Sequence, residues 1–243
     1  MTLGEHLEEL RRRLIYALLA VAASTVAALC FCPALINLLR LPYHHAMERL
    51  QMPGELVVLG VADSLSIYLM VSLYAGLIVS APVVLHQLWL FVGAGLYRRE
   101  RRMVMLSVPF SAVLFLGGAA FFLAAVSEPI LYYFMSVSRW LGTVPMITFD
   151  RYIGFMAKMM VLFGLAFQTP LVVLVLAAVG IVSIRGLNKY RRHVIIAVLV
   201  VAGVLTPPDP FSQIALAVPL WGLYELGVLL AYLLVGRKPA TGP

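Results

Sequence analysis

Long apolar runs restrict this chain to a membrane environment more strongly than any other feature of its sequence. The clearest run, Leu65–Leu90, has 26 residues and contains no Asp, Glu, Lys or Arg. About 20 apolar residues in an α-helix cross the ~30 Å hydrocarbon core of a bilayer. Hydrophobic residues make up 63% of the chain, charged residues 12%, and the mean hydropathy is +0.99. The sequence therefore predicts an all-α integral membrane protein.

Six apolar runs are predicted to form transmembrane helices, preceded by a segment of different character. The predicted spans are about 14–32, 65–90, 104–126, 153–179, 194–205 and 214–235. In residues 1–13, leucines recur every three or four positions and charges occupy the other side, which is typical of an amphipathic helix at the membrane surface. A cleaved signal peptide is the alternative, but three acids precede the basic cluster and no small-x-small site follows. We expect residues 1–243 to form a single membrane domain.

Two of the spans are predicted to be kinked at a proline, and two are predicted to be short. Pro82 and Pro170 each remove a backbone donor inside an apolar run and are expected to kink the helix. Residues 194–205 number only 12, which gives a helix of about 18 Å. We expect this fifth helix and the sixth to form a short pair that thins the bilayer locally. The alternative is a tilted or buried pair without thinning.

The distribution of basic residues predicts how the chain is oriented. Thirteen of the 18 Lys and Arg residues lie in four clusters, at residues 11–13, 98–102, 185–192 and 237–238. An excess of Lys and Arg marks the cytosolic side of a membrane protein. Six spans place all four clusters on that side, so both termini are predicted to be cytosolic. Residues 33–60 and 127–150 are then predicted to be extracytoplasmic segments.

Several functional classes are disfavoured by the same composition. The formal net charge of +7 does not indicate nucleic-acid binding, because the basic residues sit in small groups at helix ends. None of the five histidines belongs to a metal-ligand motif, and no nucleophile and base lie together at membrane depth, so we expect no metal, no cofactor and no enzyme activity. A small-solute secondary transporter remains the alternative function, although internal repeats are absent.

One charged segment is the best candidate for a binding group. Residues 97–102 are predicted to form a cytosolic loop with one carboxylate, Glu100, among four arginines. A second acid, Glu9, lies four residues before Arg13 on the amphipathic helix. The simplest interpretation is that Glu100 relieves repulsion among its neighbours and that Glu9 forms an ordinary (i, i+4) pair, which stabilises a helix by about 0.2–0.5 kcal/mol.

Motifs along nearly the whole chain, in order and at matching separations, resemble a known family. They are His6-Leu7-Glu8-Glu9-Leu10-Arg11, Ser80-Ala81-Pro82-Val83, Gln87-Leu88-Trp89, the segment from Leu96-Tyr97 to Glu100-Arg101-Arg102, Leu205-Thr206-Pro207-Pro208-Asp209 and Phe211-Ser212-Gln213. These motifs are similar to those of the TatC family, the polytopic subunit of the twin-arginine (Sec-independent) protein translocase. The resemblance implies six transmembrane helices in a cupped bundle that recognises signal peptides with consecutive arginines.

The same resemblance implies a cellular setting and partners. The protein would lie in the bacterial cytoplasmic (inner) membrane and export folded precursor proteins with energy from the proton gradient. Its partners would be the twin-arginine signal peptides, the single-span TatA and TatB subunits, further copies of itself and the lipid bilayer.

The resemblance also assigns roles to particular residues. Paired guanidinium groups are best matched by carboxylates, which accept bidentate hydrogen bonds, and the family pattern places the signal-peptide site at Glu9 and Glu100. The site is expected to include Arg11, Arg98, Arg99, Arg101 and Phe91.

Residues in the second half of the sequence form a second set of candidates. Gln168 stands where the family often has a glutamate, so it can form hydrogen bonds but cannot supply a buried charge. Glu225 is either functional or paired with a basic or tyrosyl neighbour from the first helix. Pro207, Asp209 and Gln213 are expected to shape the extracytoplasmic turn and to contact a partner.

Overall fold

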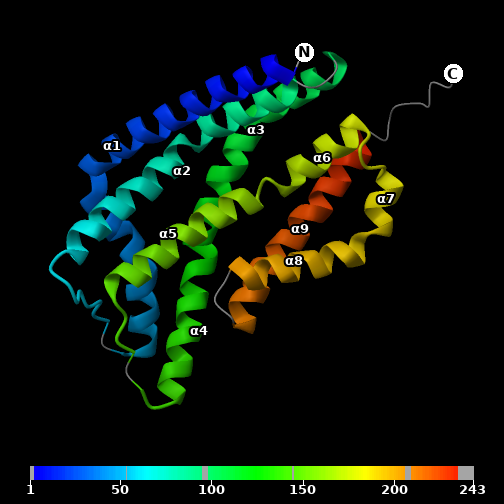
Figure 1. The fold of residues 1–243 in the computed structure, drawn as a ribbon. Coiled ribbons are helices and arrows are strands. Elements are labelled where there is room, and N and C mark those ends of the chain that lie inside the picture. Colours follow the sequence, from blue (N-terminus) through cyan, green and yellow to red (C-terminus); the bar gives the residue numbers. More distant parts are fainter. Residues whose placement is uncertain (1–2, 53, 95–97, 144, 206–208, 235–243) are drawn as a thin grey trace. The chain divides into compact units, whose positions relative to one another are not determined.

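The computed structural model describes residues 3–52, 54–94, 98–143, 145–205 and 209–234 (Figure 1). Of residues 94, 98–107, 184–185, 201 and 204–205 it describes the backbone alone. Helices account for almost all of the described chain, and the one β-type contact within it is an isolated bridge between Val57 and Thr148. The elements are α1 (Leu3–Leu50), α2 (Asp63–Ala94), α3 (Arg98–Phe121), η1 (Phe122–Val126), α4 (Ser127–Trp140), α5 (Phe149–Ala166), α6 (Thr169–Val179), α7 (Ile184–Lys189), α8 (Arg191–Leu205) and α9 (Pro210–Leu234). The predicted all-α membrane protein is confirmed.

Five helical stretches in the described residues are long and apolar enough to cross a bilayer. They are Gly4–Leu50, Asp63–Gly93, Val108–Trp140, Phe149–Val179 and Pro210–Leu234. The remaining predicted span is α8, which has 15 residues, or about 22 Å of helix. The prediction of a short fifth helix is therefore confirmed.

The prediction that the sixth helix is also short is wrong. Helix α9 has 25 residues, about 38 Å, because it already begins at Pro210. Proline is favoured in the first turn of a helix, where its missing donor is not needed. The carboxylate of Asp209 caps this end by accepting a hydrogen bond from the Ser212 backbone N–H at 2.7 Å. Residues that read as part of the proline-rich turn thus form the first turn of a membrane-length helix.

The ends of several other helices also differ from the sequence estimate. Helix α1 continues for 48 residues through Pro33 and Pro42, so most of the segment 33–60 is helical. Helix α3 continues through the π-helical turn η1 into α4. The charged segment 98–102, predicted as a loop, forms the first turn of α3, because Arg and Glu are good helix formers. Helix α2 runs through Pro82 without interruption, whereas the predicted fourth span is interrupted at Phe167–Gln168, directly before Pro170.

Residues 16–84 and 116–164 form one compact unit. In it, α1 and α2 approach closely at Gly76, where an added Cβ would lie 2.6 Å from the Thr25 backbone. The Ser24 hydroxyl donates to the Gly76 carbonyl at 2.9 Å. Small residues that allow such an approach are typical of helix pairs in membranes. An ion pair of 2.8 Å between Arg49 and Glu128 links α1 with α4.

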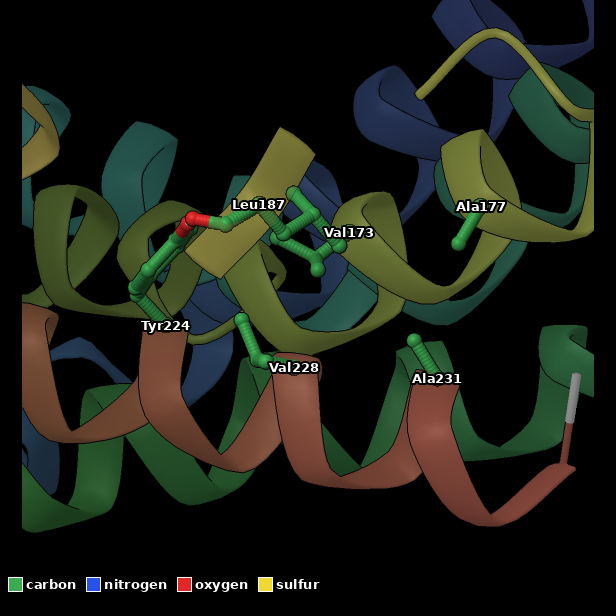
Figure 2. Close-up of a cluster of buried hydrophobic side chains, with 6 residues drawn as sticks. All are labelled: Val173, Ala177, Leu187, Tyr224, Val228 and Ala231. Carbon is green, nitrogen blue, oxygen red and sulfur yellow. The ribbon is translucent and has the colours of Figure 1, made fainter. Parts of the chain in front are cut away.

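Residues 1–15, 85–115 and 165–243 form the second unit, which contains the candidate site. Its best-packed part is a cluster between α6, α7 and α9, shown in Figure 2, made of Val173, Ala177, Leu187, Tyr224, Val228 and Ala231. The Tyr224 hydroxyl donates to the Leu187 carbonyl at 2.9 Å. Helix α9 approaches the start of α6 at Gly227, where an added Cβ would lie 2.9 Å from the Cα atom of Pro170. This packing holds α6 against α9 within the unit.

Candidate functional site at the start of the first helix

The first candidate residue, Glu9, is held by two arginines of its own helix. Arg13 donates to one carboxylate oxygen from Nε at 2.9 Å and from Nη2 at 2.6 Å. Arg12 donates to the other oxygen at 3.0 Å. The Glu9 side chain is only 15% exposed and that of Arg13 19%, whereas that of Arg12 is 60% exposed. The local (i, i+4) pair expected from the sequence is therefore present, with Arg12 as a second partner.

Arg13 also connects this helix to the next one. Its Nη1 atom donates to the side-chain oxygen of Gln87, on α2, at 3.1 Å. This contact fixes the guanidinium from both sides, so that Glu9 and Gln87 share one rigid donor. The hydrogen bonds from Arg13 lower the pKa of Glu9, which precedes the predicted span 14–32, below its usual value. The carboxylate is consequently ionised at neutral pH.

An apolar groove lies one helical turn away from this ionic contact. His6 precedes Glu9 by three residues, and its ring stacks on Phe91 with 4.5 Å between centroids. The groove has a volume of about 390 Å³ and is lined by His6, Phe91, Val92, Val175, Leu176, Val179 and Ile181. Its walls come from α1, α2 and α6 and from Ile181, two residues after the end of α6. The structure therefore places Phe91, a predicted site residue, beside the turn of α1 that carries Glu9.

The other predicted site residues are not all brought to this surface. Arg11 pairs with Glu8 at 3.8 Å, and both side chains are 73% exposed, so Arg11 does not contact Glu9. Glu100, Arg98, Arg99 and Arg101 occupy the first turn of α3, but their side chains lie outside the described residues. Their roles stay predictions. An acid in the first turn of a helix does lie at the favourable end of the helix dipole.

Gln168 is buried and hydrogen-bonded through both its amide oxygen and its amide nitrogen. Its amide oxygen accepts from the Ser111 hydroxyl at 2.7 Å, and its amide nitrogen donates to the Ser111 carbonyl at 2.9 Å. The Trp89 indole N–H donates to the same hydroxyl at 3.0 Å. The sequence singled out Gln168 but missed Ser111, because a serine in an apolar run carries no local signal of its partner.

Glu225 forms an ion pair with Arg191 of α8 at 2.8 Å. The sequence predicted, as one alternative, a basic or tyrosyl partner from the first helix. The partner is basic, but it lies on α8, so the predicted helix is wrong. The sequence could not identify Arg191, because its approach to Glu225 depends on how α8 folds back on α9. The pair lies beside a groove of about 590 Å³ lined by Asn188, Arg191, Gly222, Glu225, Leu226, Val228, Leu229 and Tyr232.

The turn between α8 and α9 has a structural role in its described part. Pro207 lies outside the described residues, and Asp209 caps α9 as noted above. The amide nitrogen of Gln213 donates to the Leu199 carbonyl at 2.9 Å, which ties the short α8 to α9. Among the described residues, no three His, Cys, Asp or Glu side chains are grouped so that they could hold a metal ion.

These features define a multi-span helical membrane protein with a carboxylate and an apolar groove near its first helix. A family model described as Sec-independent protein translocase protein (TatC) matches residues 5–219. The chain belongs to this family.

Relatives and solved structures agree over nearly the whole chain. The TatC protein of Frankia casuarinae is 37% identical, with 100% of this chain and 70% of the relative covered. That of Escherichia coli K12 is 32% identical, with 96% and 88% covered. A crystal structure of the twin arginine translocase receptor TatC is 31% identical, covers 94% of this chain and 98% of its own, and has a TM-score of 0.80. A second such structure, in DDM, has a TM-score of 0.82 at 31% identity, with 93% and 99% covered.

Proposed function

We propose that this chain is the signal-peptide receptor and core subunit of a twin-arginine translocase, which exports folded proteins across a bacterial cytoplasmic membrane. Family membership and the similarity to solved structures of a twin arginine translocase receptor support this function. The observation that carries the receptor role is the Glu9 carboxylate, which is already bound by two guanidinium groups. A site that holds two arginines of its own has the charge and geometry to accept arginines from a peptide.

The exposures of the two bound arginines suggest how a peptide enters. Arg13 is mostly buried and is also held by Gln87, so it stays in place and orients the carboxylate. Arg12 is largely exposed, and ion pairs of that kind contribute about 0–1 kcal/mol. An incoming guanidinium takes the place of Arg12 on this carboxylate oxygen when the peptide also gains a second contact. The second arginine of the peptide is assigned to Glu100, the other acid of the family pattern.

The proposal includes the setting implied by the family. Both termini lie in the cytosol, in agreement with the clustering of basic residues. TatA, TatB and further copies of this chain are its partners, and the proton gradient supplies the energy for export. The chain acts by binding and carries out no catalysis.

A binding measurement with a matched control tests the receptor role. The variants Glu9→Gln and Glu100→Gln remove one negative charge each and keep the size of the side chain. Each is expected to weaken binding of a fluorescent twin-arginine signal peptide to the purified protein by at least tenfold, since a charge-assisted contact contributes about 1.5–3 kcal/mol. Glu8→Gln removes the neighbouring exposed acid, which pairs only weakly with Arg11, and is expected to bind normally.

Two outcomes would contradict the proposal. One is equal binding by Glu9→Gln and by Glu8→Gln. The other is equal affinity of the unchanged protein for the peptide and for a version with lysines in place of both arginines, because lysine cannot form the bidentate contact.

A further inference from the structure

Three buried polar side chains from separate parts of the sequence form one closed hydrogen-bond network. Trp89 lies on α2, Ser111 on α3 and Gln168 at the break between α5 and α6, and all three are buried. The indole donates to the Ser111 hydroxyl, the hydroxyl donates to the Gln168 oxygen, and the Gln168 nitrogen donates to the Ser111 carbonyl. Every polar atom of the three side chains has a partner. Buried networks of this kind fix a single arrangement of the elements that they join.

The elements joined by the network are the ones that form the apolar groove. Trp89 lies within one turn of both Gln87, which holds Arg13, and Phe91, which lines the groove. Helix α6, which begins directly after Gln168, carries Val175, Leu176 and Val179 of the facing wall. The network therefore connects the α2 wall to the start of the α6 wall through Ser111.

The position of Gln168 gives it control over the direction of α6. The helix is interrupted here, and the Gln168 backbone carbonyl accepts from the N–H groups of Leu171 and Val172, which starts the new helix. Pro170 in the first turn prevents α6 from continuing the hydrogen bonds of α5. The regular backbone hydrogen bonds of a helix are interrupted at this break, so the side-chain contacts of Gln168 help to set the direction of α6 together with the packing of α6 on α9.

We propose that Gln168 is a positioning residue, which locks α2 and α6 through Ser111 and so sets the shape of the groove beside Glu9. This role rests on the proposed receptor function. The lock requires a group that is neutral, because the side chain must both accept from the Ser111 hydroxyl and donate to the Ser111 carbonyl. A protonated carboxyl group meets both conditions, an ionised carboxylate can only accept, and a leucine can do neither.

Substitutions at Gln168 separate positioning from general packing. Gln168→Leu keeps the volume and removes both hydrogen bonds, whereas Gln168→Glu restores both when the carboxyl group is protonated. Burial disfavours the ionised form, so protonation prevails at the acid end of the pH range. Thr169→Val is the matched control, because it removes a neighbouring hydroxyl that donates to the Ala166 carbonyl within the same chain segment and takes no part in the network.

The first measurement follows the groove itself and needs no peptide. Spin labels are attached to cysteines introduced at Val92 and Val179, one on each wall, in full-length protein in which Cys30 and Cys32 are alanine. Gln168→Leu is expected to shift or broaden the distribution of distances between the labels, and Gln168→Glu at acidic pH to restore it. Thr169→Val is expected to leave it unchanged. An unchanged distribution in Gln168→Leu, or failure of Gln168→Glu to improve on Gln168→Leu, overturns the positioning role.

The second measurement links the lock to peptide binding. Loss of a buried hydrogen-bonded partner predicts binding of the twin-arginine peptide about tenfold weaker in Gln168→Leu, with recovery in Gln168→Glu at acidic pH and decline as the pH rises. Binding as tight as in the unchanged protein overturns the proposed link. If Glu9→Gln also binds normally, the receptor function fails, while the spin-label distances still decide whether Gln168 positions the groove.

Discussion

Two glycines of the same helix provide a sharp test of the packing that supports the site. Gly227 and Gly222 both lie within α9. An added Cβ at Gly227 would lie 2.9 Å from the Pro170 Cα and 3.0 Å from the Val173 Cβ, whereas at Gly222 it would meet nothing within 4 Å. A separation below 3.0 Å from a backbone atom forces two helices apart. Alanine at position 227 therefore pushes α9 away from α6, and alanine at position 222 does not.

The size of the effect follows from the difference between the two variants. Replacing glycine by alanine inside a helix is favourable by about 1 kcal/mol at either position, so this contribution cancels in the comparison. Overpacking costs about 1–3 kcal/mol and applies only at Gly227. Gly227→Ala is thus expected to be less stable than Gly222→Ala by about 1–3 kcal/mol.

The assay is unfolding of the purified protein by SDS in mixed micelles. Tryptophan fluorescence is a suitable signal, because Trp221 lies on α9 itself. The midpoint of Gly227→Ala is expected at a lower SDS fraction than those of the unchanged protein and Gly222→Ala. Equal midpoints for the two variants would refute the close packing of α6 on α9.

Two further predictions concern single contacts. The ion pairs of Glu9 are fully present at pH values above the ordinary pKa of a glutamate. Because the pKa of Glu9 is lowered, these ion pairs are lost only as the pH falls through that lowered pKa. Peptide binding should therefore persist to unusually acidic pH, and Arg13→Gln should move the acidic limit of the binding curve upward; an unmoved limit would contradict the role of Arg13. Tyr224→Phe removes the hydrogen bond to the Leu187 carbonyl and should lower the free energy of unfolding by about 1 kcal/mol. In the same SDS assay, a midpoint equal to that of the unchanged protein would show that this bond contributes nothing.

Helix content and membrane class could be predicted from the sequence because both depend on local composition. The ends of helices were less predictable. Pro33 and Pro42 were taken to lie in a segment beyond the first span, yet α1 passes through both. The Leu29 carbonyl, four residues before Pro33, loses its usual helical donor and instead accepts from the Tyr68 hydroxyl of α2, so a neighbouring helix compensates for the proline. The start of α9 was missed for a related reason, because Pro210 begins that helix and does not end the turn.

The candidate site shows the same division between local and distant information. The contacts of Glu9 with Arg12 and Arg13 follow from spacings of three and four residues and can be read directly from the sequence. The partners of Gln168 and Glu225 cannot. Ser111 lies 57 residues before Gln168, and nothing in a single sequence indicates which of the many apolar helices will supply a hydroxyl group. Glu225 likewise needed the fold of α8 on α9 to identify Arg191.

The exposed Arg12 has a consequence for the rate at which a receptor of this kind works. A guanidinium tethered three residues from its carboxylate is present at a very high effective concentration. A lone arginine from solution competes poorly with such a tethered rival, and a tag must engage a second acid to gain a net advantage. We expect Arg12 to return to Glu9 once that second contact breaks, which would hasten release of the tag and disfavour sequences that offer only one arginine.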